Sequence, residues 1–268
     1  MRYLFCINAG RSGSNYLAEI LATAQGVAAF HEAEPTMHGE PLHQVNSAPL
    51  SSSYAERRVK VDGIVRLLAE RPWAITYAET NHMFIKTFFD VVVNELHGVE
   101  VIYLRRDPAH VLKSFVELGY FSSLNPVWPD WMSSPNAVTA AHRALDQDHA
   151  LDQYDRCIAY LYDIHARAAR FRRDYPHIVV HEVRLEDIVE LEGALALFDR
   201  LRVTPTTRTA EVAGRVVNDR PHVKERISNP ADLAECRRRL DEYSARAGAQ
   251  STGAQVPLDA RGVPSDLP

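Results

Sequence analysis

The sequence predicts an α/β protein in which helices cover both faces of a central parallel sheet, a three-layer sandwich. Short apolar runs alternate with stretches of helical periodicity along the chain. Polar clusters follow the ends of these runs, where parallel sheets bind their ligands. No internal repeat or early domain boundary interrupts the pattern. We therefore expect one domain over 1–247 and a mobile tail over 248–268, which is rich in Gly, Pro, Ser and Ala.

The first apolar run, 3–7, leads into a Gly- and Ser-rich turn and then into a helical pattern that begins near residue 14. Such a turn directs backbone N–H groups and the positive end of a helix dipole at one point, which suits a phosphate or sulfate. Four side chains add donors: Arg11, Ser12, Ser14 and Asn15. The ATP-binding loop has Lys after its second Gly, whereas Ser14 follows Gly13 here, so the β- and γ-phosphates of ATP fit poorly. An ordinary turn between strand and helix is the alternative interpretation.

Further elements follow in order. Strands are expected over the apolar runs 26–30, 73–78, 99–104 and 177–183. Helical patterns predict helices over 54–70, 83–96, 137–173, 188–201 and 230–247. Asp107 is a natural N-cap and Pro108 fits the first position of a helix after the fourth strand. Residues 42–53 read as a surface loop, and 121–136 as an ordered insertion rich in Pro and Trp.

Composition excludes several classes. The formal net charge of −5 and a pI near 6.2 argue against broad nucleic-acid binding. Three widely spaced Cys residues form neither a disulfide framework nor a zinc pattern, which suits a reducing compartment, and we expect a cytoplasmic protein without a metal. The N-terminal apolar run is too short for a signal peptide, and no run approaches the ~18–20 residues of a membrane span.

Two motifs resemble the sulfotransferases that use 3′-phosphoadenosine-5′-phosphosulfate (PAPS). Residues 11–16 are similar to that family's 5′-phosphosulfate loop, and 103–108 resemble its strand-end Arg segment, with Ser114 eight residues after Arg106. A third segment, 183–188, resembles the strand-end Glu-Asp segment of many members. The resemblance spans most of 3–190 and implies the P-loop nucleoside-triphosphate-hydrolase-like sulfotransferase fold.

This resemblance assigns the PAPS contacts. It implies that the phosphosulfate is held by Arg11, Ser12, Gly13, Ser14, Asn15 and Tyr16, and the 3′-phosphate by Arg106 and Ser114. Arg11 would also neutralise charge that develops on the bridging oxygen. The alternatives are a surface salt bridge of Arg106 with Asp107 or Glu117, and a plain helical role for Ser114. Near the C-terminus, Arg220 and Lys224 are the nearest match to a closing Arg-Lys-Gly segment, although the Gly is missing.

Sulfuryl transfer to a hydroxyl needs a general base. Five candidates follow the second and third strands, and one of them is expected to act: His31, Glu32, Glu34, Glu79 and His82. At Glu79 the sequence departs from the family's Glu-Lys-[Ser/Thr] pattern, because Thr80 replaces the Lys, and Lys86 lies far into the next helix.

The sequence thus predicts a PAPS-dependent sulfotransferase that acts on a hydroxyl, less often an amine, of a small-molecule, glycan or lipid acceptor. A P-loop kinase for small molecules or nucleosides and a non-catalytic nucleotide-binding protein are the alternatives. The apolar insertion 121–136 is open to three interpretations: an acceptor wall, a surface for a homodimer, or core.

Overall fold

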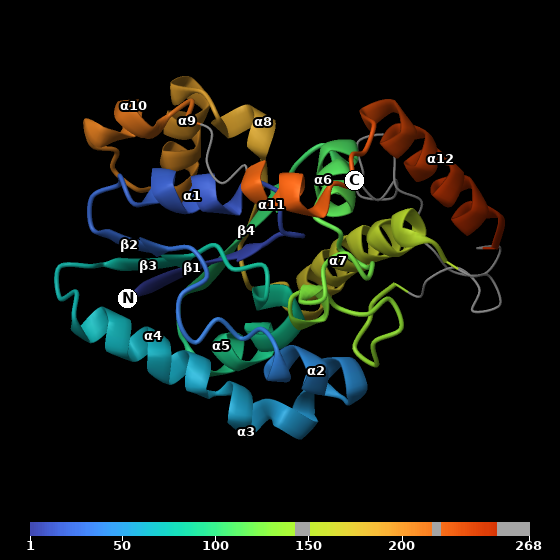
Figure 1. Cartoon of the computed structure of the whole chain (residues 1–268). Coiled ribbons are helices and arrows are strands. Elements are labelled where there is room, and N and C mark those ends of the chain that lie inside the picture. The colour runs from blue at the N-terminus through green and yellow to red at the C-terminus, as the bar shows by residue number, and fades with distance from the viewer. Residues whose placement is uncertain (143–150, 216–220, 251–268) are drawn as a thin grey trace.

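The computed structural model describes residues 1–142, 151–215 and 221–250. Within these residues, five parallel strands form a central sheet in the order β2-β3-β1-β4-β5 (Figure 1). The strands are β1 (Arg2–Ile7), β2 (Val27–Phe30), β3 (Thr76–Glu79), β4 (Val99–Arg105) and β5 (Val180–Arg184). The predicted α/β class, with a parallel sheet flanked by helices, is confirmed.

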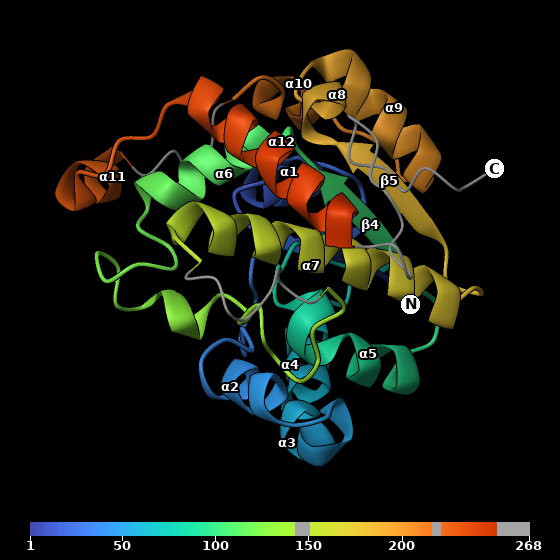
Figure 2. The ribbon, with the colours of Figure 1, turned by 90° about the vertical axis from the view of Figure 1, so that its right-hand side faces the viewer.

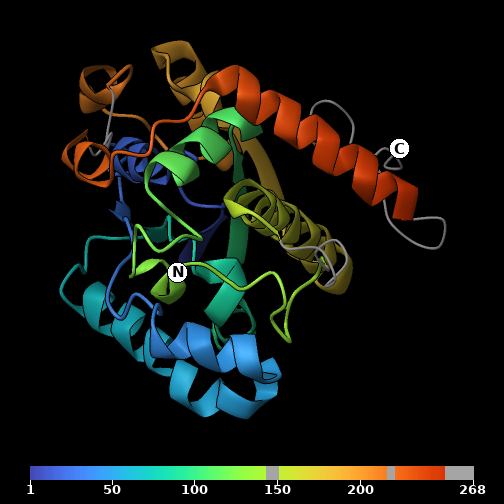
Figure 3. The same cartoon turned by 45° about the vertical axis from the view of Figure 1, so that its right-hand side comes forward.

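Two apolar clusters cover the two faces of the sheet, and Figure 1 shows helices above and below it. One face packs against α1 (Ser14–Leu21), α8 (Leu185–Ile188), α9 (Leu191–Leu201) and α10 (Arg208–Val212). The other packs against α2 (Glu40–Ser47), α3 (Tyr54–Arg57), α4 (Val59–Ala69), the π-helical turn η2 (Phe84–Phe88), α5 (Phe89–Glu95), α6 (Pro108–Glu117), α7 (Gln153–Asp174) and α12 (Leu233–Gln250). Figures 2 and 3 show α12 lying alongside α7. The short turns η1 (Leu50–Ser53) and η3 (Trp128–Asp130) and the helix α11 (Pro221–Ile227) complete the described elements.

The side chains of β1 alternate between the two apolar clusters on the two faces of the sheet. Phe5 and Ile7 enter the cluster on one face, whereas Leu4 and Cys6 enter the cluster on the other. β1 lies between β3 and β4, and the helices that follow β1 and β4 pack on opposite faces. The carboxyl ends of these two neighbouring strands therefore form a topological switch point, where ligands bind in open parallel sheets.

Several sequence predictions need correction, among them the fifth strand, which begins at Val180 rather than at residue 177. The third strand begins at Thr76 rather than residue 73, because the preceding turn leaves Trp73 59% and Ile75 70% exposed. Residues 42–53 are not an open loop: Leu42 and Val45, three positions apart, are buried on one side of α2, and η1 follows.

The long helix predicted from residue 137 begins only at Gln153. The Asp152 side chain accepts from the backbone N–H of Asp155 and so caps α7 at that point. Part of the preceding stretch, 143–150, lies outside the described residues, as does the predicted tail from 251 onward. None of the described helices is both long enough and apolar enough to cross a bilayer.

Candidate functional site

The turn between β1 and α1 is built on left-handed backbone. Gly10, Arg11 and Gly13 all have positive φ, of 80°, 54° and 86°. The Asn8 side chain accepts from the backbone N–H of Gly10 at 2.9 Å, and the Ser12 hydroxyl donates to the Gly10 carbonyl at 3.1 Å. These bonds fix the turn (hereafter the anion loop, residues 8–15) ahead of the N-terminus of α1. A non-Gly residue in this conformation, such as Arg11, marks a strained position of the kind that gathers at ligand sites.

Gly13 is required by space as well as by conformation. A Cβ placed on Gly13 would lie 2.4 Å from a methyl carbon of Leu185, which follows β5. The segment 183–188, singled out from the sequence, therefore supports the loop by packing against it. Tyr16 also serves this support: it is buried, and its hydroxyl donates to the Ile188 carbonyl at 2.8 Å.

On the β4 side, the structure brings Arg11, Arg106 and Ser114 together. Arg11 Nε donates to the Ser114 hydroxyl at 3.0 Å, and Arg106 Nη1 donates to the Arg11 carbonyl at 3.1 Å. Asp107 caps α6 by accepting from the Ala109 N–H at 2.8 Å, as expected from the sequence. Arg106 and Ser114, which follow Arg11 by 95 and 103 positions, thus meet it at the anion loop.

The sequence left two alternatives open, a salt bridge of Arg106 with an acidic neighbour such as Glu117 and a plain helical role for Ser114, and the structure shows other contacts for Glu117 and for Ser114. Glu117 pairs with Lys113 and, at 3.2 Å, with Lys224, so it is not the partner of Arg106. Ser114 is buried, and its hydroxyl contacts the Arg11 guanidinium rather than serving only as a helix position.

On the β3 side, His82 lies against the same loop. A Cβ on Gly10 would lie 3.4 Å from His82 Nδ1, so the imidazole contacts the loop backbone closely. His82 Nε2 is 3.5 Å from Glu32 Oε1, and His31 Nε2 is 3.7 Å from the same oxygen. Glu32, 22% exposed at its side chain, has a positive φ of 51°, a second strained position in the site.

Lys86 joins this cluster from η2. Its Nζ is 3.1 Å from His82 Nδ1, 2.6 Å from the Trp131 carbonyl and 3.1 Å from the Tyr160 hydroxyl. Three acceptors match the three N–H groups of an ammonium, although burial, followed by the Arg167 charge, lowers the pKa of Lys86. Tyr160 in turn donates to the Ala9 carbonyl at 3.1 Å, which ties Lys86 to the anion loop.

This geometry assigns a tautomer to His82. If Nδ1 accepts from Lys86, the proton of a neutral imidazole sits on Nε2 and faces Glu32. Glu32 Oε1 then lies 3.5 Å from the protonated ring nitrogen.

Glu79 has a different environment. It is 1% exposed, and its carboxylate accepts from Lys60 Nζ at 2.6 Å, the Tyr77 hydroxyl at 2.7 Å and the Asn81 amide at 2.9 Å. Lys60 also donates to the Ala33 carbonyl at 2.8 Å. Burial lowers the pKa of Lys60, and the Glu79 charge opposes that shift. Glu79 therefore acts as the buried counter-ion that holds the segment after Glu32 in place.

The insertion 121–136 contributes both core and site. Phe121 and Met132 are buried, whereas Leu124 is 51% exposed. Trp131 stacks on His38 with ring centroids 4.1 Å apart, and lies parallel to His82 at 5.8 Å. The insertion thus supplies an aromatic wall beside His82.

Other candidates lie apart from these contacts. Glu34 is exposed and accepts from the Thr36 N–H at 3.2 Å. Lys224, on α11, pairs with Glu117 on α6, and Arg220 lies outside the described residues. Ser14 is buried in the first turn of α1, and Asn15, which follows it, is half-buried.

The sequence interpretation missed Tyr160, and it set Lys86 aside as too far into the next helix. Trp131 belongs to the insertion 121–136, for which an acceptor wall was one of the three interpretations. The spacing of four residues between His82 and Lys86 was a signal for a shared helical face. Tyr160 carries no comparable local signal, because tertiary packing alone brings it to the anion loop.

The site combines the donor groups of Arg11, Arg106 and Ser114, the proposed anion-binding side, with Glu32 and His82, the proposed proton-accepting side. Among the described residues, no group of three or more His, Cys, Asp or Glu side chains is placed to hold a metal ion. Comparison of the chain with protein-family models and with curated proteins finds no match in either case.

Proposed function

We propose that this protein is a sulfotransferase that moves the sulfuryl group of PAPS to a hydroxyl of an acceptor. The observation that carries the proposal is the convergence of Arg11, Arg106 and Ser114 on the anion loop. The motif resemblance assigns these same residues to the phosphosulfate and the 3′-phosphate. The strand order supports the assignment, because it places the loop at the switch point between β1 and β4.

The donor set fits the proposed co-substrate. PAPS carries two anionic groups, a 5′-phosphosulfate and a 3′-phosphate. The loop amides at the start of α1 and the Arg11 guanidinium suit the first group. Arg106 offers a planar fork and Ser114 a hydroxyl to the second. When bound, PAPS supplies the sulfuryl group, and the P-loop-like sulfotransferase fold is part of this proposal.

Glu32 is the proposed general base. It is a carboxylate with partial exposure beside the loop, and His82 fixes its orientation through Oε1. Lys86 holds the His82 tautomer, so His82 acts as a positioning residue. Glu32 would accept the proton of the acceptor hydroxyl as the new bond to sulfur forms. The buried ion pair of Glu79 makes it unsuited to this role.

The aromatic pair His38 and Trp131 is the proposed wall for the acceptor, because it stands beside His82 at the proton-accepting side. A flat aromatic surface suits a ring or the apolar face of a sugar. The acceptor class remains a small molecule, a glycan or a lipid. The three described Cys residues are free and buried, which suits the proposed cytoplasmic location.

A thermal-shift measurement on the full chain tests the proposal. PAP, the product of the donor, at 100 times its Kd should stabilise the fold by about 2.7 kcal/mol. For a protein of this size, that free energy corresponds to about 5–10 °C in Tm. Transfer of sulfate from PAPS to a panel of hydroxyl acceptors, without added magnesium, is the activity readout. Stabilisation by ATP with magnesium but not by PAP would overturn the proposal in favour of a kinase.

A further inference from the structure

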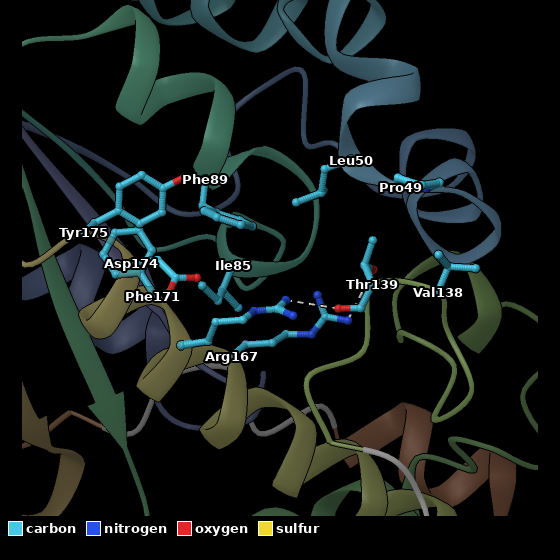
Figure 4. Close-up of a pocket in the computed structure, with 11 residues that line it drawn as sticks. Pro49, Leu50, Ile85, Phe89, Val138, Thr139, Arg167, Phe171, Asp174 and Tyr175 are labelled. Atoms are coloured by element: carbon cyan, nitrogen blue, oxygen red, sulfur yellow. Dashed lines mark hydrogen bonds between the residues drawn. The ribbon is translucent and has the colours of Figure 1, made fainter.

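A cavity of about 430 Å³ lies on the α7 side of the sheet, and no residue of the anion loop lines it (Figure 4). Its volume falls within the range of about 300–1,000 Å³ typical of small-molecule sites. The lining residues come from η1 and the residue before it, from η2 and α5, from 138–139 and from α7. They are Pro49, Leu50, Ile85, Phe89, Val138, Thr139, Arg167, Arg170, Phe171, Asp174 and Tyr175.

Arg167 gives the cavity a buried donor without an acceptor. The residue is 2% exposed. Its Nε donates to Asp163 at 2.6 Å and its Nη2 to the Thr139 hydroxyl at 3.4 Å, but Nη1 has no hydrogen-bond partner among the described residues. Figure 4 shows the Arg167 side chain reaching from α7 toward Thr139. A buried N–H left without an acceptor is costly, and a ligand oxygen within reach of Nη1 would remove that cost.

Arg170 adds a second cation on the same face of α7, three positions further on. Its Nη2 donates to the Thr139 carbonyl at 3.1 Å, and no carboxylate of the described chain pairs with it directly. Burial, and next the neighbouring Arg167 charge, lowers the pKa of Arg170. Asp174, which also lines the cavity, pairs with Arg173 at 3.0 Å. This end of the cavity therefore carries an excess of positive charge.

The remaining wall is mainly apolar. Apolar side chains line the cavity in addition to the polar ones, and Figure 4 labels, among others, Leu50, Ile85, Phe89 and Phe171. An apolar wall that ends in two guanidinium groups complements a molecule with an apolar body and one anionic head.

We propose that this cavity is a second ligand site, which binds an organic carboxylate with the acid group on Arg167 and Arg170 and the apolar body against Phe89 and Phe171. The proposal is independent of the sulfotransferase assignment. Arg167 follows Tyr160, which contacts the anion loop, by seven residues on α7. Seven residues span about 10 Å of helix, so the two sites are neighbours with separate donors.

Calorimetric titration of the full chain with octanoate tests the proposal, with octanol as the neutral probe of the same length. We expect one octanoate per chain and at least tenfold weaker binding of octanol, because only the carboxylate accepts from the guanidinium groups. Arg170→Gln should weaken octanoate by about tenfold or more. Val138→Asp, at a residue that is 58% exposed, should do the same by charge repulsion without disturbing the core.

Two control variants make the result specific. Arg156→Gln removes an exposed charge from the same helix, and Arg106→Ala removes a cation that contacts the anion loop. Both should leave octanoate affinity within about twofold. Equal binding of octanol and octanoate, or equal losses in Arg170→Gln and Arg156→Gln, would overturn the proposal. A loss confined to Arg106→Ala would place octanoate at the anion loop and would also overturn it.

Discussion

Replacement of Arg106 by Ala removes one guanidinium from the proposed 3′-phosphate side while leaving the anion loop sequence intact. In the structure this guanidinium donates to the Arg11 carbonyl at 3.1 Å, next to the Arg11–Ser114 bond. A hydrogen bond to a charged group contributes about 1.5–3 kcal/mol. A loss of about 2 kcal/mol corresponds to about 30-fold weaker PAP binding.

The assay compares two ligands that differ in the group concerned. PAP carries the 3′-phosphate, whereas adenosine 5′-phosphosulfate lacks it, so calorimetry should show the 30-fold loss for PAP and less than about threefold for the second ligand. Arg105→Ala is the matched control, because Arg105 pairs with Glu182 at 3.7 Å and lies over the Tyr103 ring instead of the loop. Equal losses for the two ligands, or equal losses in the two variants, would refute the assigned role of Arg106.

Three further predictions follow from the proton-accepting side and the core. Glu32→Gln should lower kcat by about 10²–10⁴-fold, the usual contribution of a general base, with PAP affinity unchanged within about twofold in calorimetry. Lys60→Met should destabilise the protein by about 3 kcal/mol or more in urea unfolding, because it leaves Glu79 buried (1% exposed) without its cation. Unfolding free energy should also fall by about 3 kcal/mol between pH 7 and pH 4 because of His165, whose pKa is lowered from 6.5 to about 4 by burial and then by the Arg105 charge.

The sign of the His165 effect follows from proton binding. Below pH 6.5, the ordinary pKa of a histidine, His165 binds a proton in the unfolded chain but stays neutral in the folded chain. The contribution of neutral His165 to the unfolding free energy is therefore fully present above pH 6.5 and is lost as the pH falls toward 4. His165→Gln should flatten this part of the curve, whereas the exposed His177→Gln should not. An unchanged slope in His165→Gln would contradict the assignment.

Controls for the other two variants come from neighbouring residues. Glu34→Gln alters a nearby but exposed carboxylate and should retain nearly full activity; a loss equal to that of Glu32→Gln would argue against Glu32 as the base. The double variant Lys60→Met with Glu79→Gln removes both charges and should recover part of the lost stability. If it is no more stable than Lys60→Met alone, the buried pair is not the cause of the loss.

The anion-binding side could be predicted because local sequence determines most of it. A strand, a turn with glycines at positive φ and a helix give the loop, and a capped helix after the fourth strand carries Arg106 and Ser114. Parallel strands place their carboxyl ends at one edge of the sheet, so adjacency of β1 and β4 was sufficient to bring the two motifs together. All the predicted strands are present, since apolar runs of this length identify buried parallel strands, although β3 and β5 begin later than predicted.

Helix boundaries were harder to predict from the sequence, because single contacts determine where a helix begins or ends. Asp152 starts α7 by capping it, although apolar residues continue the helical pattern upstream. Leu42 and Val45 bury one side of α2, although the stretch is rich in turn-forming residues. In both cases tertiary packing or a single cap outweighed average propensity.

The choice between Glu32 and Glu79 shows where sequence reasoning ends. Both carboxylates lie at the carboxyl ends of neighbouring strands, Glu32 after β2 and Glu79 at the end of β3, and the only local difference in the sequence is Thr80 after Glu79. Glu79 differs because Lys60, from a helix preceding its strand, occupies the position of a counter-ion, where the family pattern has a Lys immediately after the Glu. The absence of a Lys at position 80 therefore does not leave Glu79 without a cation, because tertiary packing places Lys60 against it. The Glu79 carboxylate is occupied by a buried cation and two further donors, whereas Glu32 lies beside an imidazole and is 22% exposed at its side chain. The buried contact of Lys60 with Glu79 cannot be read from the local sequence, and it is the reason why we propose Glu32 rather than Glu79 as the base.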